Sequence, residues 1–128
     1  MKRNEKITVL LVDDHEMMRQ GLCKIVNDQK DMVVIGEASN GKEAVELCRT
    51  ISPDTIIMDV SMPVMNGIEA TKVIKYQLPN ARIIGLSLHD STAIIQHMRN
   101  AGATAFLKKD DAFETLCKTI RTIAFASE

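Results

Sequence analysis

The chain has 128 residues, 45% of them hydrophobic, which is typical of one domain that builds its own core. Its formal net charge of −1 excludes the overall basic field by which many domains bind nucleic acid, so a DNA contact would require another module. The first apolar run, 7–12, is too short for a signal peptide core or a membrane span. We therefore expect a cytoplasmic protein that does not engage a membrane.

Short apolar runs rich in β-branched residues predict strands at 7–12, 32–38, 55–60, 82–88 and 103–108. Between them, apolar residues at helical spacing predict five helices. The first runs through Met18, Leu22, Ile25 and Val26 with Asp14 as its cap, and the others cover 44–51, 67–76 and 90–101 and an apolar stripe of Phe113, Leu116, Cys117, Ile120, Ile123 and Ala124. Cys23, Cys48 and Cys117 occupy apolar helical positions, which favours reduced, buried thiols over disulfides.

This alternation predicts an α/β fold, a doubly wound (βα)5 domain with a five-stranded parallel sheet. The flavodoxin-like strand order 2-1-3-4-5 is the natural solution at this size, and it puts the switch point between the first and third strands. Asp13 and Asp14 follow the first strand, and Asp59 ends the third. We expect these three carboxylates to meet at one edge of the sheet.

Converging carboxylates repel one another unless a cation compensates them. Mg2+ is the expected cation, because it prefers oxygen ligands and commonly takes one or two carboxylates together with waters. Two structural roles are alternatives to the interpretation of these aspartates as a metal site. Asp59 alone is compatible with a turn cap, and Asp13 or Asp14 with a helix cap, although capping explains only one residue of the pair.

Two further strands end in groups suited to an anion. Ser87 offers a hydroxyl at the end of the fourth strand, and Lys108 and Lys109 offer ammonium groups after the fifth. Each residue alone is commonplace in a structural role. Together with Asp59 and a metal they predict a site for a phosphoryl group.

The segments LLVDDH, IIMDVSMPVMNG, LSLHD and GATAFLKKD, in this order, resemble the receiver domain of bacterial two-component response regulators, and in particular the NarL and LuxR-type transcription regulators. The resemblance covers about residues 6–125. It implies that Asp59 is the phosphoacceptor, that Asp14 binds Mg2+ directly and Asp13 holds a metal-bound water, and that the backbone carbonyl of Ser61 is a further metal ligand.

The resemblance also assigns the residues that respond to phosphorylation. Its spacing makes Lys109, not Lys108, the conserved-type lysine and Phe106 the switch aromatic, in place of the commoner tyrosine. Phe106 lacks a phenolic hydroxyl, so a buried resting position is expected. Acyl phosphate on Asp59 would draw Ser87 inward and alter the surface of the fourth helix, fifth strand and fifth helix. Ser61 and His89 are expected to tune the lifetime of the phosphoryl group.

The implied function is a signalling switch, not an enzyme beyond its own phosphotransfer and autodephosphorylation. A sensor histidine kinase is the expected phosphodonor, residues 1–128 the single receiver domain, and a homodimer a possible phosphorylated form. Transcription control would require a C-terminal DNA-binding effector domain outside this chain; a stand-alone receiver acting through protein contacts is the alternative. An aspartyl-nucleophile phosphohydrolase is disfavoured, because its first two aspartates are normally separated by one residue and it carries a cap insertion.

Overall fold

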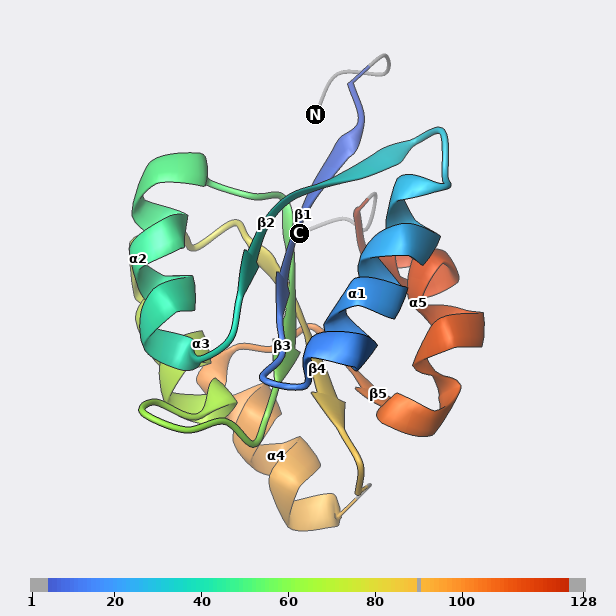
Figure 1. Ribbon diagram of the computed structural model, residues 1–128. Helices are drawn as coiled ribbons and strands as arrows, with labels where there is room; N and C mark the ends of the chain where they lie inside the picture. The colour runs from blue at the N-terminus through green and yellow to red at the C-terminus, as the bar shows by residue number, and fades with distance from the viewer. Residues whose placement is uncertain (1–4, 90, 125–128) are drawn as a thin grey trace.

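The computed structural model describes residues 5–89 and 91–124 (Figure 1). Its five parallel strands have the order β2-β1-β3-β4-β5, which confirms the predicted fold. The strands are β1 (Ile7–Val12), β2 (Met32–Ala38), β3 (Thr55–Asp59), β4 (Arg82–Ser87) and β5 (Ala105–Lys108). The helices are α1 (Glu16–Asn27), α2 (Gly41–Ile51), α3 (Gly67–Gln77), α4 (Thr92–Ala101) and α5 (Lys109–Ala124).

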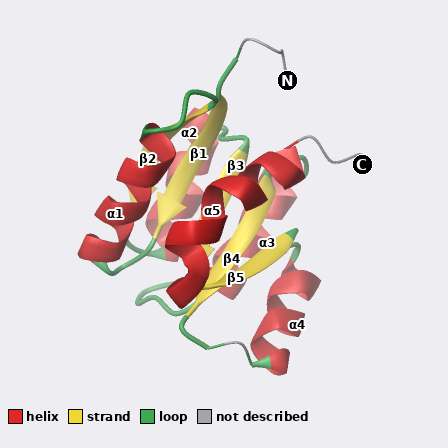
Figure 2. Cartoon of the chain, turned by 90° about the vertical axis from the view of Figure 1, so that its right-hand side faces the viewer, coloured by secondary structure: helices red, strands yellow, loops and turns green. Residues whose placement is uncertain are grey.

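Helices cover both faces of the sheet, with α1 and α5 on one face and α2, α3 and α4 on the other (Figure 2). Successive residues of a strand face opposite sides. Leu10 and Ile56 accordingly enter the core under α2 and α3, whereas Leu11 and Ile57 enter the core under α1 and α5. Both faces are therefore apolar, which explains the continuous hydrophobic runs of the central strands.

Helices α2 and α3 begin with caps that the sequence analysis did not identify. Asn40 accepts a hydrogen bond from the Glu43 backbone N–H, and Asn66 accepts one from that of Glu69, at 2.9 and 3.0 Å. The Glu43 carboxylate reaches back to the Ser39 N–H at 2.8 Å. The pattern at α2 resembles the capping box, and the two asparagine caps mark where the helices start.

The predicted cap of α1 is wrong. The N-cap residue is His15, and its side chain makes no capping hydrogen bond. Asp14 lies one residue too early to cap the helix, and its carboxylate lies 3.4 Å from the Nδ1 atom of His15. Asp13 instead accepts the His15 backbone N–H at 2.8 Å, so the acid pair shapes the turn before α1.

Other predictions needed correction at element ends. Strand β5 begins at Ala105, two residues later than expected, because the Ala103 N–H donates to the Met98 carbonyl and continues the end of α4. The predicted start of α4, Asp90, lies outside the described residues, and α4 begins at Thr92. Phe113 was expected in the buried stripe of α5 but is 45% exposed.

The three cysteines are free thiols, as expected, although only Cys48 is fully buried, while Cys23 and Cys117 are half-buried. Burial raises the pKa of the Cys23 and Cys48 thiols to about 11. Among the helices of the described residues, none has both the length and the apolar character needed to cross a lipid bilayer.

Candidate functional site

Four polar side chains are buried together at the carboxyl ends of four strands. Asp13 follows β1, Asp59 ends β3, Ser87 ends β4 and Lys109 follows β5 as the first residue of α5. Their exposed fractions are only 1%, 2%, 6% and 6%. Burying charged groups is costly unless they are paired, so their common position at this edge indicates a site.

Lys109 joins the two buried carboxylates. Its Nζ atom lies 3.1 Å from the Oδ2 atoms of both Asp13 and Asp59, and it donates to the Asp13 Oδ1 atom at 3.2 Å. One ammonium group thus faces two carboxylates. Lys108, by contrast, pairs with Ser87 across the β4–β5 ladder and is half-buried.

The Asp59 carboxyl has an unusually high affinity for protons. Burial, followed by the nearby Asp13 charge, raises the pKa of Asp59 to about 7, against the opposing effect of Lys109. The negative charge is therefore under-compensated at this edge, and an additional cation would favour the ionised form of Asp59.

The geometry fits a divalent cation. Asp13, Asp14, His15 and Asp59 each offer one ligand atom, and these atoms all lie within 4.8 Å of one another. Among the described residues, the buried Oδ2 atoms of Asp13 and Asp59 have only the shared Lys109 ammonium, at 3.1 Å from each, as a polar partner. Asp14 is exposed, so the candidate cation position is open to water on the side of Asp14. Oxygen-rich, partly hydrated surroundings of this kind suit Mg2+.

A hollow of about 100 Å³ adjoins Asp59 and gives a small anion access to it. It is lined by His15, Asp59, Ser61, Ser87, Leu88, His89 and Lys109. The Ser61 N–H donates to the Asp59 Oδ1 atom at 3.3 Å, and the His89 N–H donates to Ser87 Oγ at 3.1 Å. Because Ser87 Oγ accepts this bond, its own hydrogen stays available to an anion in the hollow.

Phe106 lies in β5, the strand that leads to Lys109. Its side chain is half-buried against the core under α2, α3 and α4. It pairs with Gly85 of β4, where an added Cβ would lie 3.0 Å from the Phe106 ring and 3.0 Å from Met98 Cε. Gly85 therefore provides the space in which the ring rests. The resting position is half-buried, less enclosed than the expected one.

The loop between β3 and α3 is fastened close to Asp59. The Gly67 N–H donates to the Val60 carbonyl and the Gly41 N–H donates to the Met65 carbonyl, each at 2.9 Å. A Cβ atom at Gly67 would overlap the Asp59 carbonyl, so only glycine permits this approach. Between these bonds, Val64 is 79% exposed and has a φ of 68°.

His15 is the site residue that the sequence analysis missed. Its Nδ1 atom lies 3.1 Å from Asp13 Oδ1 and 3.0 Å from Lys109 Nζ. The sequence feature that could have identified His15 is its position directly after Asp13 and Asp14, where the chain turns from β1 into α1.

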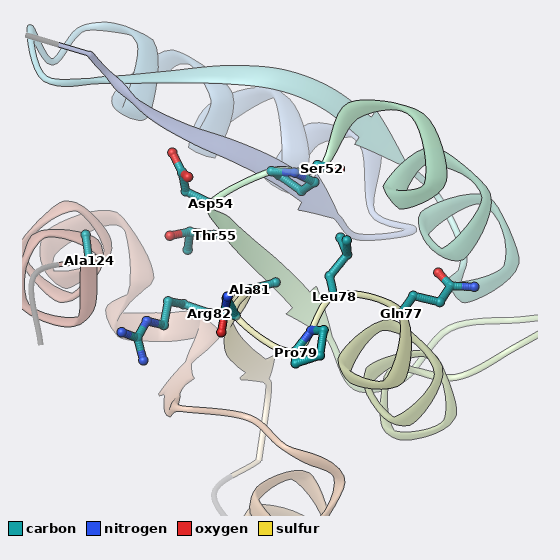
Figure 3. A pocket seen from close by; sticks show the side chains of 11 residues that line it. Ser52, Asp54, Thr55, Gln77, Leu78, Pro79, Ala81, Arg82 and Ala124 are labelled. Atoms are coloured by element: carbon teal, nitrogen blue, oxygen red, sulfur yellow. The ribbon is translucent and has the colours of Figure 1, made fainter. Parts of the chain in front are cut away.

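A separate hollow of about 390 Å³ lies at the opposite edge of the sheet (Figure 3). Asp54, Thr55 and Arg82 are among its lining residues. Asp54 accepts hydrogen bonds from the Thr8 backbone and hydroxyl, which indicates a structural role. The hollow lies at the amino ends of β3 and β4, away from the carboxyl ends where open α/β sheets bind ligands.

The fold and the site together define a doubly wound α/β domain with a buried acidic site at its switch point. Residues 9–121 match the family described as "Response regulator receiver domain", and the chain therefore belongs to that family.

Known relatives are of the NarL and LuxR kind that the motifs predicted. The chain is 41% identical to "Response regulator UvrY" of Escherichia coli (strain K12) over 117 residues, 91% of this chain and 54% of that protein. It is 35% identical to "Nitrate/nitrite response regulator protein NarL" of the same strain over 124 residues, 97% of this chain and 57% of that protein. The chain thus spans about half the length of these relatives.

A solved structure shows the same fold. The chain is similar to a "two-component response regulator, LuxR family, from Aurantimonas sp. SI85-9A1", with a TM-score of 0.88 and 31% sequence identity. The match covers 94% of this chain and 86% of that one.

Proposed function

We propose that this receiver domain is a phosphorylation-dependent switch in which Asp59 accepts a phosphoryl group from a phosphohistidine of a sensor histidine kinase. The observation that carries the proposal is the 2% exposed Asp59 carboxylate, which faces an open hollow while Lys109 Nζ lies 3.1 Å away. A purely structural aspartate would not be kept beside both an acid pair and a cavity.

In the transfer, one Asp59 carboxylate oxygen attacks phosphorus in line with the phosphorus–nitrogen bond of the donor. That bond breaks, the imidazole nitrogen keeps the electron pair, and Asp59 becomes an acyl phosphate. Lys109 and the Ser87 hydroxyl face the hollow and orient the phosphoryl oxygens.

Asp13, Asp14, Asp59 and the Ser61 carbonyl are the groups that would hold Mg2+. When bound, Mg2+ supplies charge neutralisation on the phosphoryl oxygens. The chain's own part is to place two buried carboxylates and one exposed carboxylate at the edge of the hollow.

The signal leaves the site through β4 and β5. Ser87 moves toward the phosphoryl group and vacates space near β4, the Phe106 ring turns inward into that space, and the surface of α4, β5 and α5 is altered. This is a two-state element whose equilibrium is shifted by a local change of charge.

Ser61 and His89 line the mouth of the hollow and are expected to control the approach of water. Substitution of either residue should change the rate of autodephosphorylation much more than the free energy of unfolding. The decay of phosphorylated protein, followed by intact mass, tests this expectation. Unchanged decay in both variants would contradict it.

We further propose that residues 1–128 form one receiver domain of a longer transcription regulator, in which a DNA-binding effector domain and a phosphorylation-dependent homodimer give the output. The support is that the relatives are about twice as long as this chain and bear the names of transcriptional and response regulators.

The decisive experiment incubates the domain with Mg2+ and acetyl phosphate and measures its intact mass. We expect the gain of one phosphoryl group, which should require Mg2+ and disappear in Asp59→Asn. Asp28→Asn removes the same charge from an exposed helix end and is the matched control, which should still be phosphorylated. No gain in the wild-type protein would refute the proposed function.

A further inference from the structure

His15 brings a nitrogen atom into an otherwise oxygen-lined site. Its Nδ1 atom lies 3.1 Å from Asp13 Oδ1, 3.4 Å from Asp14 Oδ1 and 3.0 Å from Lys109 Nζ. The imidazole side chain is 56% exposed, so the ring stands between this cluster and solvent.

These three neighbours make conflicting demands on one atom. If Nδ1 carries no proton, it accepts from the Lys109 ammonium but directs its lone pair among two carboxylate oxygens. If Nδ1 carries a proton, it donates to a carboxylate but places that proton against the ammonium. Neither protonation state satisfies all three contacts. A metal cation satisfies the nitrogen and the carboxylates together, because it accepts electron pairs from each of them.

We propose that His15 Nδ1 joins Asp13, Asp14 and Asp59 in binding a first-row transition-metal ion such as Mn2+, Co2+ or Zn2+, so that this site prefers these ions to Mg2+. The inference rests on the metal site of the proposed function and adds a ligand and a metal class to it.

The distances suit one ion. With bonds of about 2.1 Å, neighbouring ligands of an octahedral ion lie roughly 3.0 Å apart and opposite ligands roughly 4.2 Å apart. His15 Nδ1 has the first kind of spacing to Asp13 and Asp14, and the four ligand atoms span at most 4.8 Å. Small side-chain rotations bring the set onto one ion.

A second observation supports an ion at this position. The buried Oδ2 atoms of Asp13 and Asp59 share one ammonium group, Lys109 Nζ at 3.1 Å from each, as their polar partner within the described part of the chain, so two carboxylates have one cation between them. When a metal takes the His15 nitrogen, Lys109 would lose that neighbour while the two carboxylates remain beside it.

The nitrogen ligand decides which metals are favoured. Mg2+ is a hard ion with a strong preference for oxygen, so His15 adds little to its binding. Imidazole suits the later first-row ions, whose affinities for such sites rise along the series from Mn2+ to Cu2+. Removal of His15 should therefore weaken Co2+ binding selectively.

The first test uses pulsed electron paramagnetic resonance of Mn2+ bound to tag-free domain labelled with 15N-histidine. We expect a 15N coupling in the wild-type protein, its loss in His15→Ala, and its retention in His89→Ala. His89 is the matched control, because it lines the same hollow but is not among the candidate ligands. Bound Mn2+ without histidine coupling in the wild-type protein would overturn the inference, whether or not the variant folds.

Calorimetric titration gives the second test. His15→Ala should lower Co2+ affinity by at least about tenfold, on the scale seen when groups that support a metal ligand are lost, and should change Mg2+ affinity by less than about threefold. Equal losses for both ions would overturn the inference while the proposed Mg2+ site survives. Binding of neither ion to the wild-type protein would overturn both, and the acetyl phosphate experiment then shows whether phosphorylation itself requires Mg2+.

Discussion

Asp59→Asn should stabilise the domain when divalent cations are absent, although it destroys the proposed acceptor. The pKa of Asp59 is raised from its ordinary value of 3.8 to about 7, chiefly by burial and then by Asp13. Between these two values, the folded state holds a proton that the unfolded state has released. Stability therefore falls as pH rises from about 4 to about 7, and it stays low above that range.

The size of this loss of stability follows from the difference between the folded and unfolded pKa values of Asp59. A separation of about 3 pH units corresponds to at most about 4 kcal/mol, since each unit is worth about 1.4 kcal/mol. The Asp59→Asn variant would avoid this ionisation cost, but its buried amide costs about 1–3 kcal/mol where it lacks partners, so we expect a net gain of roughly 1–3 kcal/mol at pH 8.

Urea unfolding in EDTA between pH 4.5 and 8 measures the effect. The stability difference between Asp59→Asn and wild type should grow by about 1.4 kcal/mol per pH unit up to pH 7 and then level off. The exposed control, Asp28→Asn, should run parallel to wild type. Mg2+ should narrow the difference, because a ligand of the folded state stabilises the wild-type protein. Parallel curves for Asp59→Asn and wild type would refute the reasoning.

Four substitutions and one labelling reaction test the packing. Leu116→Ala, at a fully buried position, should cost about 2–5 kcal/mol in urea unfolding, whereas Phe113→Ala, at a position 45% exposed, should cost less than half as much; equal losses would contradict the assigned helix face. Gly67→Ala should lower stability by about 1–3 kcal/mol through overlap with the β3 backbone, and an unchanged melting temperature would count against that close approach. Val64→Asn should raise stability by up to about 1 kcal/mol, because Asn tolerates a φ of 68° better than Val, and a loss would show that the Val64 side chain has a packing role. Maleimide should label Cys48 only after unfolding, since the native thiol is buried and its pKa is about 11.

The strand order and the edge at which the polar side chains gather were predictable because they depend on strong, local signals. The runs at 7–12 and 55–60 are apolar on both faces, and parallel strands bring their carboxyl ends to one edge. Asp13, Asp59, Ser87 and Lys109 therefore meet where the order 2-1-3-4-5 requires. Their catalytic and metal-binding roles remain predictions for the experiments above.

The wrong predictions concern two properties: which face of a helix a side chain occupies, and which residue of a turn caps the following helix. Phe113 lies one residue beyond Ala112 in α5, about 100° around the helix, and so leaves the stripe that Ala112, Leu116 and Ile120 bury. Asp14 was expected to cap α1, but the turn places His15 at that position instead. Sequence spacing does not determine these orientations, because tertiary packing selects them.

His15 was missed for a different reason. A single histidine after an acid pair carries little information by itself, and its meaning depends on Lys109, which is 94 residues away in the sequence. Long-range proximity of this kind appears only once the chain is folded.

The fastened loop after Asp59 has a consequence for how such proteins diverge. Gly67 and Gly41 hold its two ends by backbone hydrogen bonds, while Val64 at its tip is largely exposed. Side chains at the tip can change over evolutionary time without moving Asp59, because the bonds from Gly67 and Gly41 that hold the two ends of the loop join main-chain atoms only. A duplicated gene could in this way present a new surface beside Asp59 while the buried cluster of Asp13, Asp59 and Lys109 is inherited unchanged.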